Sequence, residues 1–365
     1  MKKILLLCQQ HGCPIELSPA RYQLIHELSK RDYEIYVFYP GRIRDKKIKE
    51  EIHYFTNTLN LSIISIRNKI IKVAPENIIA FTYEDTRILY PLQKIMKSTS
   101  FIYYNLEIYT PSMEQYIQAK GLFFDVRCGV IYLQNKMKEI SFTKGCKIFI
   151  IQDKLRKKTS AKYFIHHPNT LLIPNSYTFH KEDEIGNERS GIIYSGGLNK
   201  LQLESLMPQL ETIPDLPITF SGWSDDWFIV QFKKMKALNP SCKFYHQKLP
   251  PEKLSVFLKQ YAVGFIWYSP IKDENINNIG LASGKLFKHL SLGQPVIVNE
   301  SPGIDKVVEK YELGIVIRDA SELKKAYEQI MKRYSYYQKN IRDVYENKFD
   351  YEKVVQPFLN QLEYL

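Results

Sequence analysis

Short apolar runs recur along the first half of the chain, and most are followed by a segment with the length and spacing of an amphipathic helix. Runs of this kind predict β-strands, whereas apolar positions three and four residues apart predict helices. We expect strands at residues 3–8, 34–39, 61–66, 77–82, 101–105 and 147–151, and helices at 18–31, 84–97, 112–140 and 153–163. This alternation predicts a parallel sheet with helices on both faces.

The second half repeats the plan after a polar stretch without periodicity, "YTFHKEDEIGNERS", at 177–190. Its strands are expected at residues 191–196, 217–222, 243–247, 262–268, 295–299 and 314–317. The pattern therefore predicts an α/β protein with two doubly wound, Rossmann-like domains at 1–176 and 191–345, joined by the linker 177–190. We expect the last helical segment, 346–365, to pack back on the first domain.

The composition agrees with two folded domains and bears on where in the cell the protein is expected. The chain has 365 residues, of which 44% are hydrophobic and 25% charged, as in globular proteins. No apolar run reaches the roughly 18 residues of a membrane span, and the start "MKKILLLCQQHG" is too short for a signal peptide, so we expect a cytoplasmic protein. The five cysteines form no CxxC pair, so neither disulfides nor a metal site is expected.

The charge points to an anionic partner. Lys and Arg number 51 against 39 Asp and Glu, a formal net charge of +12. Nucleic acid ranks last among anionic partners, because no nucleic-acid-binding motif accompanies the charge. The basic clusters at 41–49 and 154–158 suit docking on an anionic membrane, and equally well an ordinary solvated face.

Two glycine turns follow predicted strands of the second domain. Gly196 and Gly197 lie in "YSGGLNK", with Lys200 at the start of the next helix. Gly222 and Trp223 lie in "FSGWSDDW". Glycines allow a ligand to approach the backbone, and a helix N-terminus attracts phosphate; an exposed Trp can stack on a base or sugar. A tight turn and a core Trp are the alternative interpretations.

A third segment, "SGKLFKHLSLGQPVIVNESPG" at 283–303, predicts an amphipathic helix followed by a strand. Ser283 is expected to cap this helix, and Leu286, Phe287 and Leu290 to face inward. Lys285 then lies beside the exposed amides of the first turn, an arrangement suited to an anion. A solvated surface lysine is the alternative.

In order and spacing, these segments resemble the C-terminal half of GT-B glycosyltransferases, nearest the GT4-like enzymes of bacterial surface polysaccharide synthesis. The resemblance rests on "YSGGLNK", "YHQKLPPEKLSVFLKQYAVGFIWYSP" and "SGKLFKHLSLGQPVIVNESPGIDKVVEKYELGIVI", and it is specific over about 190–320. It is looser over 18–40, 101–111 and 171–176. It implies the GT-B fold, in which two Rossmann-like domains face a central cleft.

The resemblance implies a metal-independent hexosyltransferase without a cofactor, whose substrates are a UDP- or GDP-sugar and a glycan or lipid-linked acceptor. Such an enzyme would work in the cytoplasm, on the inner face of the membrane if it docks there. The diphosphate is expected on Gly196, Gly197, Lys200 and Lys285, assisted by backbone donors at Leu281, Ala282, Ser283 and Gly284, with Gly222, Trp223, Asn278 and Lys288 completing the donor site.

Two departures from the family pattern concern this donor site. Many GT4 members carry two glutamates separated by seven residues, and those positions are Gly280 and Lys288 here. The family's arginine after the first glycine falls on Gly197. Lys200 and Lys285 are left as the expected partners of the diphosphate.

The acceptor is expected on the N-terminal domain. In the loop after the first strand, His11 is suited to proton transfer, Gly12 leaves room for a ligand, and Arg21 lies in a family-like position. Glu107 follows the strand 101–105 and is a second candidate for proton transfer. A solvated histidine is the alternative for His11.

Two other functions stay open at this point. The missing glutamates suit a non-catalytic GT-B-fold support protein for another transferase. A nucleotide-sugar 2-epimerase has the same architecture, although the sequence offers no clear pair of acidic and histidine residues for its reaction.

Overall fold

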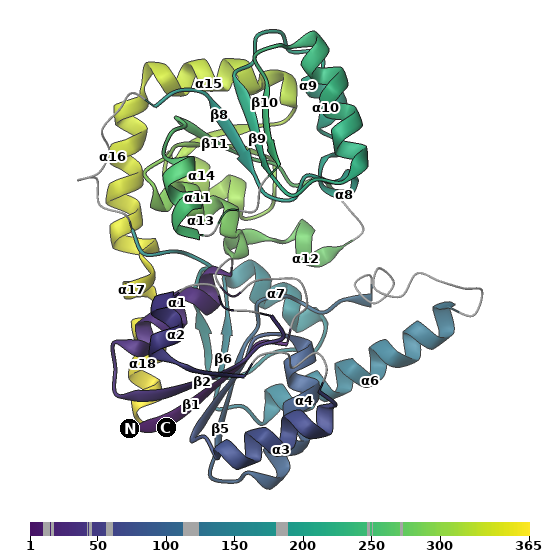
Figure 1. Ribbon diagram of the computed structural model, residues 1–365, viewed down its shortest axis with the longest axis vertical. Helices are drawn as coiled ribbons and strands as arrows, with labels where there is room; N and C mark the ends of the chain where they lie inside the picture. Colours follow the sequence, from purple (N-terminus) through teal and green to yellow (C-terminus); the bar gives the residue numbers. More distant parts are fainter. Residues whose placement is uncertain are drawn as a thin grey trace. The chain divides into compact units, whose positions relative to one another are not determined.

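The chain folds into two units, each built on its own parallel sheet. The computed structural model describes residues 1–365 except 10–14, 16–17, 42, 44–45, 56–60, 112–123, 180–188, 247–248, 250 and 271–272. Unit 1 comprises Met1–Pro174, Lys272–Asn275 and Val354–Leu365, and unit 2 comprises Asn175–Ile271 and Ile276–Lys353 (Figure 1). The chain thus crosses from one unit to the other more than once, and its last helix belongs to unit 1.

Unit 1 is built on a parallel sheet with the strand order β3-β2-β1-β4-β5-β6-β7. Its strands are β1 (Lys2–Leu7), β2 (Tyr33–Phe38), β3 (His53–Phe55), β4 (Asn77–Ala80), β5 (Ser100–Tyr104), β6 (Ile148–Ile151) and β7 (Thr170–Leu172). Its helices are α1 (Pro19–Ser29), α2 (Lys46–Glu51), α3 (Ile63–Val73), α4 (Tyr83–Ile95), α6 (Phe124–Lys144), α7 (Lys154–Lys162) and α18 (Gln356–Glu363). The sequence-based expectation of a doubly wound sheet is confirmed here.

One expected strand of unit 1 is a helix, and two short strands were missed. Residues 61–66 belong largely to α3, where the Ser62 side chain accepts a hydrogen bond from the Ser65 amide at 3.1 Å. Ile66 and Ile70 are buried four residues apart, while Ile64 is 68% exposed, so the run follows helical and not strand periodicity. The edge strands β3 and β7 span three residues each, too few for a periodic signal.

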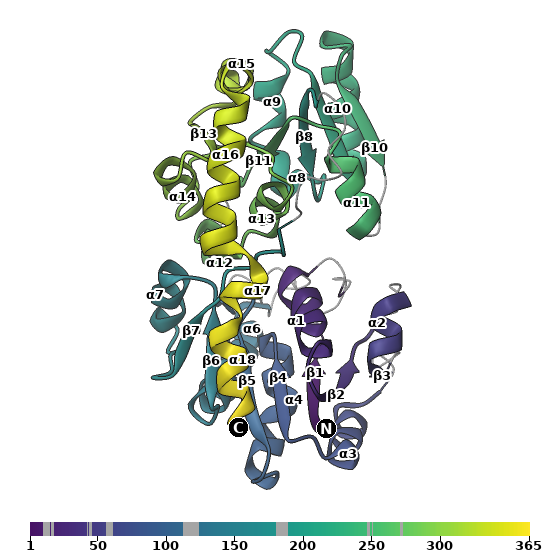
Figure 2. The same ribbon diagram turned by 90° about the vertical axis from the view of Figure 1, so that its left-hand side faces the viewer.

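The C-terminal helix α18 is tied to unit 1 by polar contacts. Lys2 Nζ donates to the Glu363 carbonyl at 3.0 Å, and Arg31 donates to Gln356 Oε1 at 3.0 Å and also pairs with Glu363. Buried apolar residues of the helix, Phe358, Leu359 and Leu362, complete its attachment. Figure 2 shows α18 and the preceding α17 (Tyr351–Val354) in yellow.

Unit 2 repeats the architecture with the strand order β10-β9-β8-β11-β12-β13, all parallel. Its strands are β8 (Ile192–Ser195), β9 (Ile218–Gly222), β10 (Lys243–His246), β11 (Val263–Ile266), β12 (Val296–Asn299) and β13 (Gly314–Ile317). Its main helices are α8 (Lys200–Leu203), α9 (Met207–Leu210), α10 (Asp226–Leu238), α11 (Pro251–Leu258), α13 (Gly284–Ser291), α14 (Ile304–Lys310), α15 (Leu323–Lys332) and α16 (Tyr334–Val344). In such sheets, ligands bind beyond the carboxyl ends of the strands, near the point where the strand order reverses, here between β8 and β11.

The helix predicted after residue 283 is present and anchored in the core. Leu286, Phe287 and Leu290 are fully buried, as expected, and pack with residues of β12 and α16 in one apolar cluster. The first turn of α13 is thereby fixed at the carboxyl edge of the sheet of unit 2. This edge is where the sequence places the donor site.

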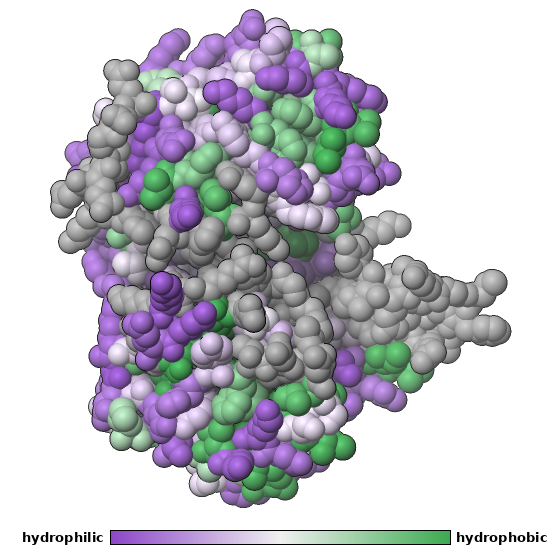
Figure 3. Space-filling view, in the orientation of Figure 1, coloured by the Kyte–Doolittle hydropathy of each residue, from purple (hydrophilic) through white to green (hydrophobic). Residues whose placement is uncertain are grey.

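The described surface bears on the expected docking at a membrane. Within the described ranges, no helix is long and apolar enough to span a bilayer. Among the coloured atoms of Figure 3, hydrophobic side chains form small separate groups between hydrophilic ones. In the cluster 154–158, Lys154, Lys157 and Lys158 are exposed, but Arg156 is fully buried and donates to Asn275 Oδ1 at 2.8 Å.

Candidate functional site

The two glycine turns of unit 2 are close-packed against each other and against Lys285. A Cβ atom built on Gly222 would lie 1.8 Å from the carbonyl oxygen of Gly196. One built on Gly196 would lie 2.6 Å from Cε of Lys285. Both glycines have φ +153°, a conformation that other residues rarely adopt. Glycine is therefore required at both turns, and the Gly196 backbone forms a wall against the Lys285 side chain.

Lys285 lies in the first turn of α13, and aromatic side chains hold it there. Ser283 caps the helix by accepting a hydrogen bond from the Leu286 amide at 3.2 Å, and Tyr268 Oη lies 2.8 Å from the Ser283 hydroxyl. Lys285 Nζ donates to Tyr194 Oη at 2.9 Å. It also lies 4.7 Å from the ring centre of Tyr194 and 5.3 Å from that of Tyr268, within the range of cation–π attraction.

This ammonium group is a desolvated cation without a counter-ion in the described residues. Burial lowers the pKa of Lys285, opposed by the charge interaction with Tyr268. Burial also raises the pKa of Tyr194, so that phenol stays neutral and does not balance the charge. An ammonium has three N–H donors, and Tyr194 takes one. The site is therefore suited to an anion that accepts the remaining donors and the amides of the α13 N-terminus.

The other predicted donor residues differ in what they offer. Lys200 is 58% exposed at its side chain and forms a surface ion pair with Glu204 at 3.5 Å. Trp223 is 55% exposed, so its indole is available for stacking. Gly197, Asn278, Leu281 and Gly284 are partly buried and Ala282 is buried. The carbonyl groups of Leu281 and Ala282 accept hydrogen bonds from Asn175, which ties this turn to the start of unit 2.

Lys288 is buried deeper on the same helix than Lys285. It is 8% exposed, its Nζ donates to Ser255 Oγ at 2.6 Å, and it lies 4.7 Å from the ring centre of Tyr177. Burial, with a smaller contribution from Lys259, lowers its pKa to about 8. Lys288 occupies the position where relatives carry a glutamate, and here its ammonium is enclosed by neutral partners.

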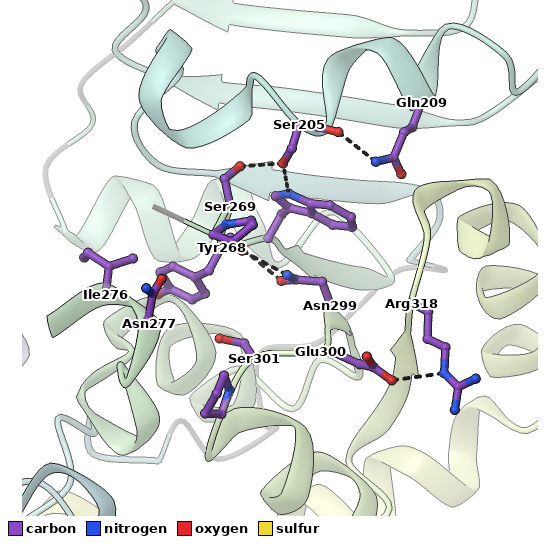
Figure 4. Close-up of a pocket in the computed structure, with 13 residues that line it drawn as sticks. Ser205, Gln209, Tyr268, Ser269, Ile276, Asn277, Asn299, Glu300, Ser301 and Arg318 are labelled. Atoms are coloured by element: carbon purple, nitrogen blue, oxygen red, sulfur yellow. Dashed lines mark hydrogen bonds and ion pairs between the residues drawn. The ribbon is translucent and has the colours of Figure 1, made fainter. Parts of the chain in front are cut away.

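A cavity of about 480 Å³ opens beside Tyr268 (Figure 4). It lies at the carboxyl ends of β11, β12 and β13, and its lining includes Trp267, Tyr268, Asn299, Glu300 and Arg318. None of the predicted donor residues lines it, although Asn277, next to Asn278, does. The cavity could not be predicted from the sequence, because its walls come from segments more than 100 residues apart.

The carboxyl edge of unit 1 carries acidic groups. Asp85 is fully buried and accepts hydrogen bonds from the amides of Gln9, Phe81 and Thr82 at 2.8, 2.9 and 3.0 Å. Burial raises its pKa to about 6, although the charge of Arg21 lowers it. Arg21 is itself fully buried, 5.5 Å from the ring centre of Phe81. The structure thus places Arg21 in the interior, next to this carboxylate.

Sequence reasoning missed Glu84, the neighbouring carboxylate at the start of α4. Burial raises its pKa to about 7, opposed by a hydrogen bond from Thr82 and assisted by the charges of Asp85 and Glu107. Glu107, which the sequence predicted as a site residue, is thus close enough for its charge to raise the pKa of Glu84. Both residues follow strands of the unit 1 sheet. His11 and Gly12 lie outside the described residues. The sequence signal that could have identified Glu84 is its position directly after "FTY", in the turn between a predicted strand and a predicted helix.

A metal site is not evident in the described part of the chain, where no group of three or more His, Cys, Asp or Glu side chains is placed to hold an ion.

Comparison with known proteins bears on the family and the fold of the chain. Residues 192–348, within the span of unit 2, match the family described as the glucosyltransferase 3-like C-terminal domain. No curated protein matches the chain in sequence.

Solved structures resemble the chain over its whole length. A sucrose-phosphate synthase from Thermosynechococcus elongatus is 15% identical with a TM-score of 0.73, over 100% of this chain and 98% of its own. HepE of Anabaena in complex with UDP is 14% identical with a TM-score of 0.70, over 100% of both chains, and it was also solved with UDP-glucose. WaaG, a glycosyltransferase involved in lipopolysaccharide biosynthesis, is 12% identical with a TM-score of 0.67, over 97% of this chain and 98% of its own. At these identities the likeness shows the fold, and it confirms the GT-B fold that the sequence resemblance implied.

Proposed function

We propose that this GT-B chain is a glycosyltransferase that moves a hexosyl unit from a UDP- or GDP-sugar to a glycan or lipid-linked oligosaccharide. The reaction needs no metal in this proposal, because Lys285 and helix amides take the part of a cation. The pathway we propose is bacterial surface polysaccharide synthesis in the cytoplasm. The exposed lysines of α7 are available to dock the enzyme on an anionic membrane.

The observation that carries the proposal is the Lys285 ammonium group. It is desolvated, held between Tyr194 and Tyr268, and has no carboxylate partner among the described residues. A desolvated cation of this kind is stabilised when a ligand supplies the negative charge. A diphosphate at the α13 N-terminus supplies that charge.

The same group would promote the reaction. When the glycosyl bond breaks, negative charge develops on the departing nucleoside diphosphate, and donors fixed in advance stabilise that charge without having to reorganise. Lys285 and the amides at Ser283 and Gly284 are held in place by the helix cap and the aromatic contacts. We assign Gly197 the role of letting the diphosphate approach the backbone, whereas Gly196 and Gly222 shape the site through their close packing on Lys285 and on each other.

The acceptor belongs to unit 1 in this proposal. Glu107 is retained as a candidate for proton transfer, together with His11, and Gly12 as an acceptor contact. Arg21, which was also expected to contact the acceptor, is fully buried and is placed instead to balance the charge of Asp85. Glu84 joins Glu107 and His11, because a carboxyl group with a pKa of about 7 exchanges protons near neutral pH. An acceptor hydroxyl that attacks the donor must lose a proton, and these groups are suited to receive it.

A thermal-shift panel with UDP, GDP, CMP, ADP and their sugars tests the proposal. We expect at least one nucleoside diphosphate to raise the melting temperature of the unaltered protein. Lys285→Ala should weaken binding of that diphosphate by about 10- to 100-fold, since a charge-assisted hydrogen bond is worth about 1.5–3 kcal/mol. Binding of the matching nucleoside should change much less.

The matched control is Lys306→Ala, which removes an exposed lysine on α14. It should leave nucleotide binding unchanged. Equal losses for nucleoside and diphosphate in Lys285→Ala would refute the assignment of Lys285. Failure of every nucleotide to bind would refute both enzymatic readings. Binding without turnover across a panel of acceptors would favour the support protein instead.

A further inference from the structure

The cavity beside Tyr268 is not part of the diphosphate site proposed at Lys285, but it lies next to that site. Tyr268 lines the cavity, its hydroxyl lies 2.8 Å from the Ser283 hydroxyl, and its ring centre lies 5.3 Å from Lys285 Nζ. One residue therefore separates the cavity from the predicted phosphate position. A group bonded directly to a diphosphate at Lys285 has the reach to enter the cavity.

The size and position of the cavity suit a small ligand. Its volume of about 480 Å³ lies within the roughly 300–1,000 Å³ that is usual for ligand sites. It lies at the carboxyl ends of three parallel strands, the edge at which doubly wound sheets bind ligands. The location thus agrees with a ligand that extends from the β8–β11 switch point toward β13.

The lining of the cavity combines apolar surface with groups that form hydrogen bonds. Six of its residues carry hydroxyl or amide side chains: Ser205, Ser269, Ser301, Gln209, Asn277 and Asn299. Glu300 and Arg318 add a carboxylate and a guanidinium, 3.0 Å apart, which Figure 4 shows facing each other. The pair carries no net charge, so it does not favour a second phosphate. Its oxygens accept, and its N–H groups donate, hydrogen bonds of the kind that sugar hydroxyls form.

The aromatic residues of the cavity do not favour a nucleobase. Trp267 is only 5% exposed, and its indole N–H donates to Ser205 Oγ at 3.2 Å, so its faces are packed in the core. The Tyr268 ring packs against Lys285, whose Nζ lies 5.3 Å from the ring centre, and its hydroxyl bonds to that of Ser283. A base needs an exposed aromatic face to stack on, and in unit 2 Trp223 offers one outside the cavity.

From these contacts we propose that the cavity binds the sugar unit of the nucleotide-sugar donor and that Glu300 and Arg318 select which sugar it accepts. The inference rests on the proposed function, because it needs the diphosphate at Lys285. It goes beyond that function by assigning donor specificity to two residues that follow β12 and β13.

The floor of the cavity is fixed, whereas the Glu300–Arg318 pair is exposed. Asn299 holds the Tyr268 backbone on both sides, accepting from its N–H and donating to its carbonyl, each at 2.9 Å. The Ser269 hydroxyl donates to the Gln202 carbonyl at 2.7 Å. Glu300 and Arg318 are 57% and 85% exposed at their side chains, so they are available to a ligand. Exchange of these two residues should therefore change selectivity without disturbing the fold.

Isothermal titration of the full chain tests the inference. UDP and UDP-glucose are the probes, replaced by GDP and GDP-mannose if the thermal-shift panel selects GDP. Glu300→Gln and Arg318→Gln should each weaken binding of the nucleotide-sugar about tenfold and change binding of the bare diphosphate less than twofold. Lys285→Ala should weaken both. Glu309→Gln, an exposed carboxylate on α14 outside the cavity, is the matched control and should change neither.

Each other outcome counts against the assignment. Equal weakening of diphosphate and nucleotide-sugar by the cavity variants would place the nucleoside diphosphate part in the cavity, and no weakening would remove the cavity from the donor site. Melting curves establish that the variants fold. If the unaltered chain binds no nucleotide, the proposed function fails and the inference with it. Diphosphate binding together with unchanged binding of the nucleotide-sugar in the cavity variants refutes the inference alone.

Discussion

The two units share a strand order around their switch points, yet the carboxyl edges of their sheets differ in charge. In unit 2 the edge carries Lys285 at the start of α13, with Lys288 one turn deeper. In unit 1 it carries Asp85 and Glu84 after β4 and Glu107 after β5. We therefore expect the first edge to attract a diphosphate and the second to repel it. In this proposal, two sheets of the same strand order bind different ligands because the side chains at their carboxyl edges differ.

The largest effect is expected from a substitution that disrupts the packing of the glycine turns at the unit 2 edge. Gly222→Ala places a Cβ atom 1.8 Å from the Gly196 carbonyl oxygen, a backbone atom that cannot move away easily. We expect a loss of about 3 kcal/mol or more in the free energy of unfolding. All three tryptophans, Trp223, Trp227 and Trp267, lie in unit 2, so urea unfolding followed by tryptophan fluorescence reports on this unit.

The control for this substitution is Gly293→Ala. Gly293 also has a positive φ, +65°, but an added Cβ would meet nothing within 4 Å. It should cost only about 1 kcal/mol, from backbone strain alone. Similar losses in the two variants would show that the contact between the glycine turns is not tight.

The second prediction concerns the pH dependence of stability that the buried Lys288 gives to unit 2. The pKa of Lys288 falls from 10.5 to about 8 on folding, so the unfolded chain binds more protons between these values. Stability therefore rises as pH rises from about 8 to 10.5, by about 3 kcal/mol, and this contribution is lost as pH falls through 8. Lys288→Met should remove this dependence and leave UDP binding within threefold.

Tryptophan fluorescence during urea unfolding at several pH values measures the effect. Lys306→Met, at an exposed lysine of α14, is the control and should keep the pH dependence of the unaltered protein. A strong loss of UDP binding in Lys288→Met, with the fold intact, would make Lys288 a donor contact as the sequence suggested.

The third prediction gives unit 1 the opposite pH dependence. The pKa of Glu84 rises from 4.5 to about 7, so the folded chain binds more protons between these values. This group's contribution to stability is complete below about 4.5 and is lost as pH rises through 7, by about 2 kcal/mol after allowance for partial exposure. Glu84→Gln should remove it.

Hydrogen exchange of the β4–α4 peptides at pH 5 and pH 8 follows this unit, which contains no tryptophan. In the unaltered protein, protection corrected for intrinsic exchange should be lower at pH 8, and Glu84→Gln should reduce the difference. Glu76→Gln, at a carboxylate near the amino end of β4, is the control and should leave the difference unchanged. An unchanged difference in Glu84→Gln would assign the effect to Asp85.

Periodicity was sufficient for the two sheets but not for their sites. Alternating apolar runs predicted the strands that are four or more residues long, and the 61–66 run was mistaken because four isoleucine and leucine residues suit either period. The capping role of Ser283 and the inward face of α13 followed from local rules. Burial of Lys288 and Arg156, the raised pKa of Glu84 and the cavity did not, because they depend on neighbours such as Ser255, Asn275 and Arg318 that are distant in sequence.

The smallest expected effect separates the two lysines that the sequence offered for the diphosphate. Lys200 is 58% exposed at its side chain and forms an ion pair with Glu204, whereas Lys285 is desolvated and held by Tyr194. A charge in water is screened, so Lys200→Ala should change stability by less than about 0.5 kcal/mol and UDP affinity by about threefold at most. That small effect should vanish in 0.5 M salt, while the loss in Lys285→Ala should persist, because a desolvated pair is screened much less. Titrations at low and high salt measure both, and a salt-resistant loss in Lys200→Ala would mean that bound diphosphate draws Lys200 away from Glu204.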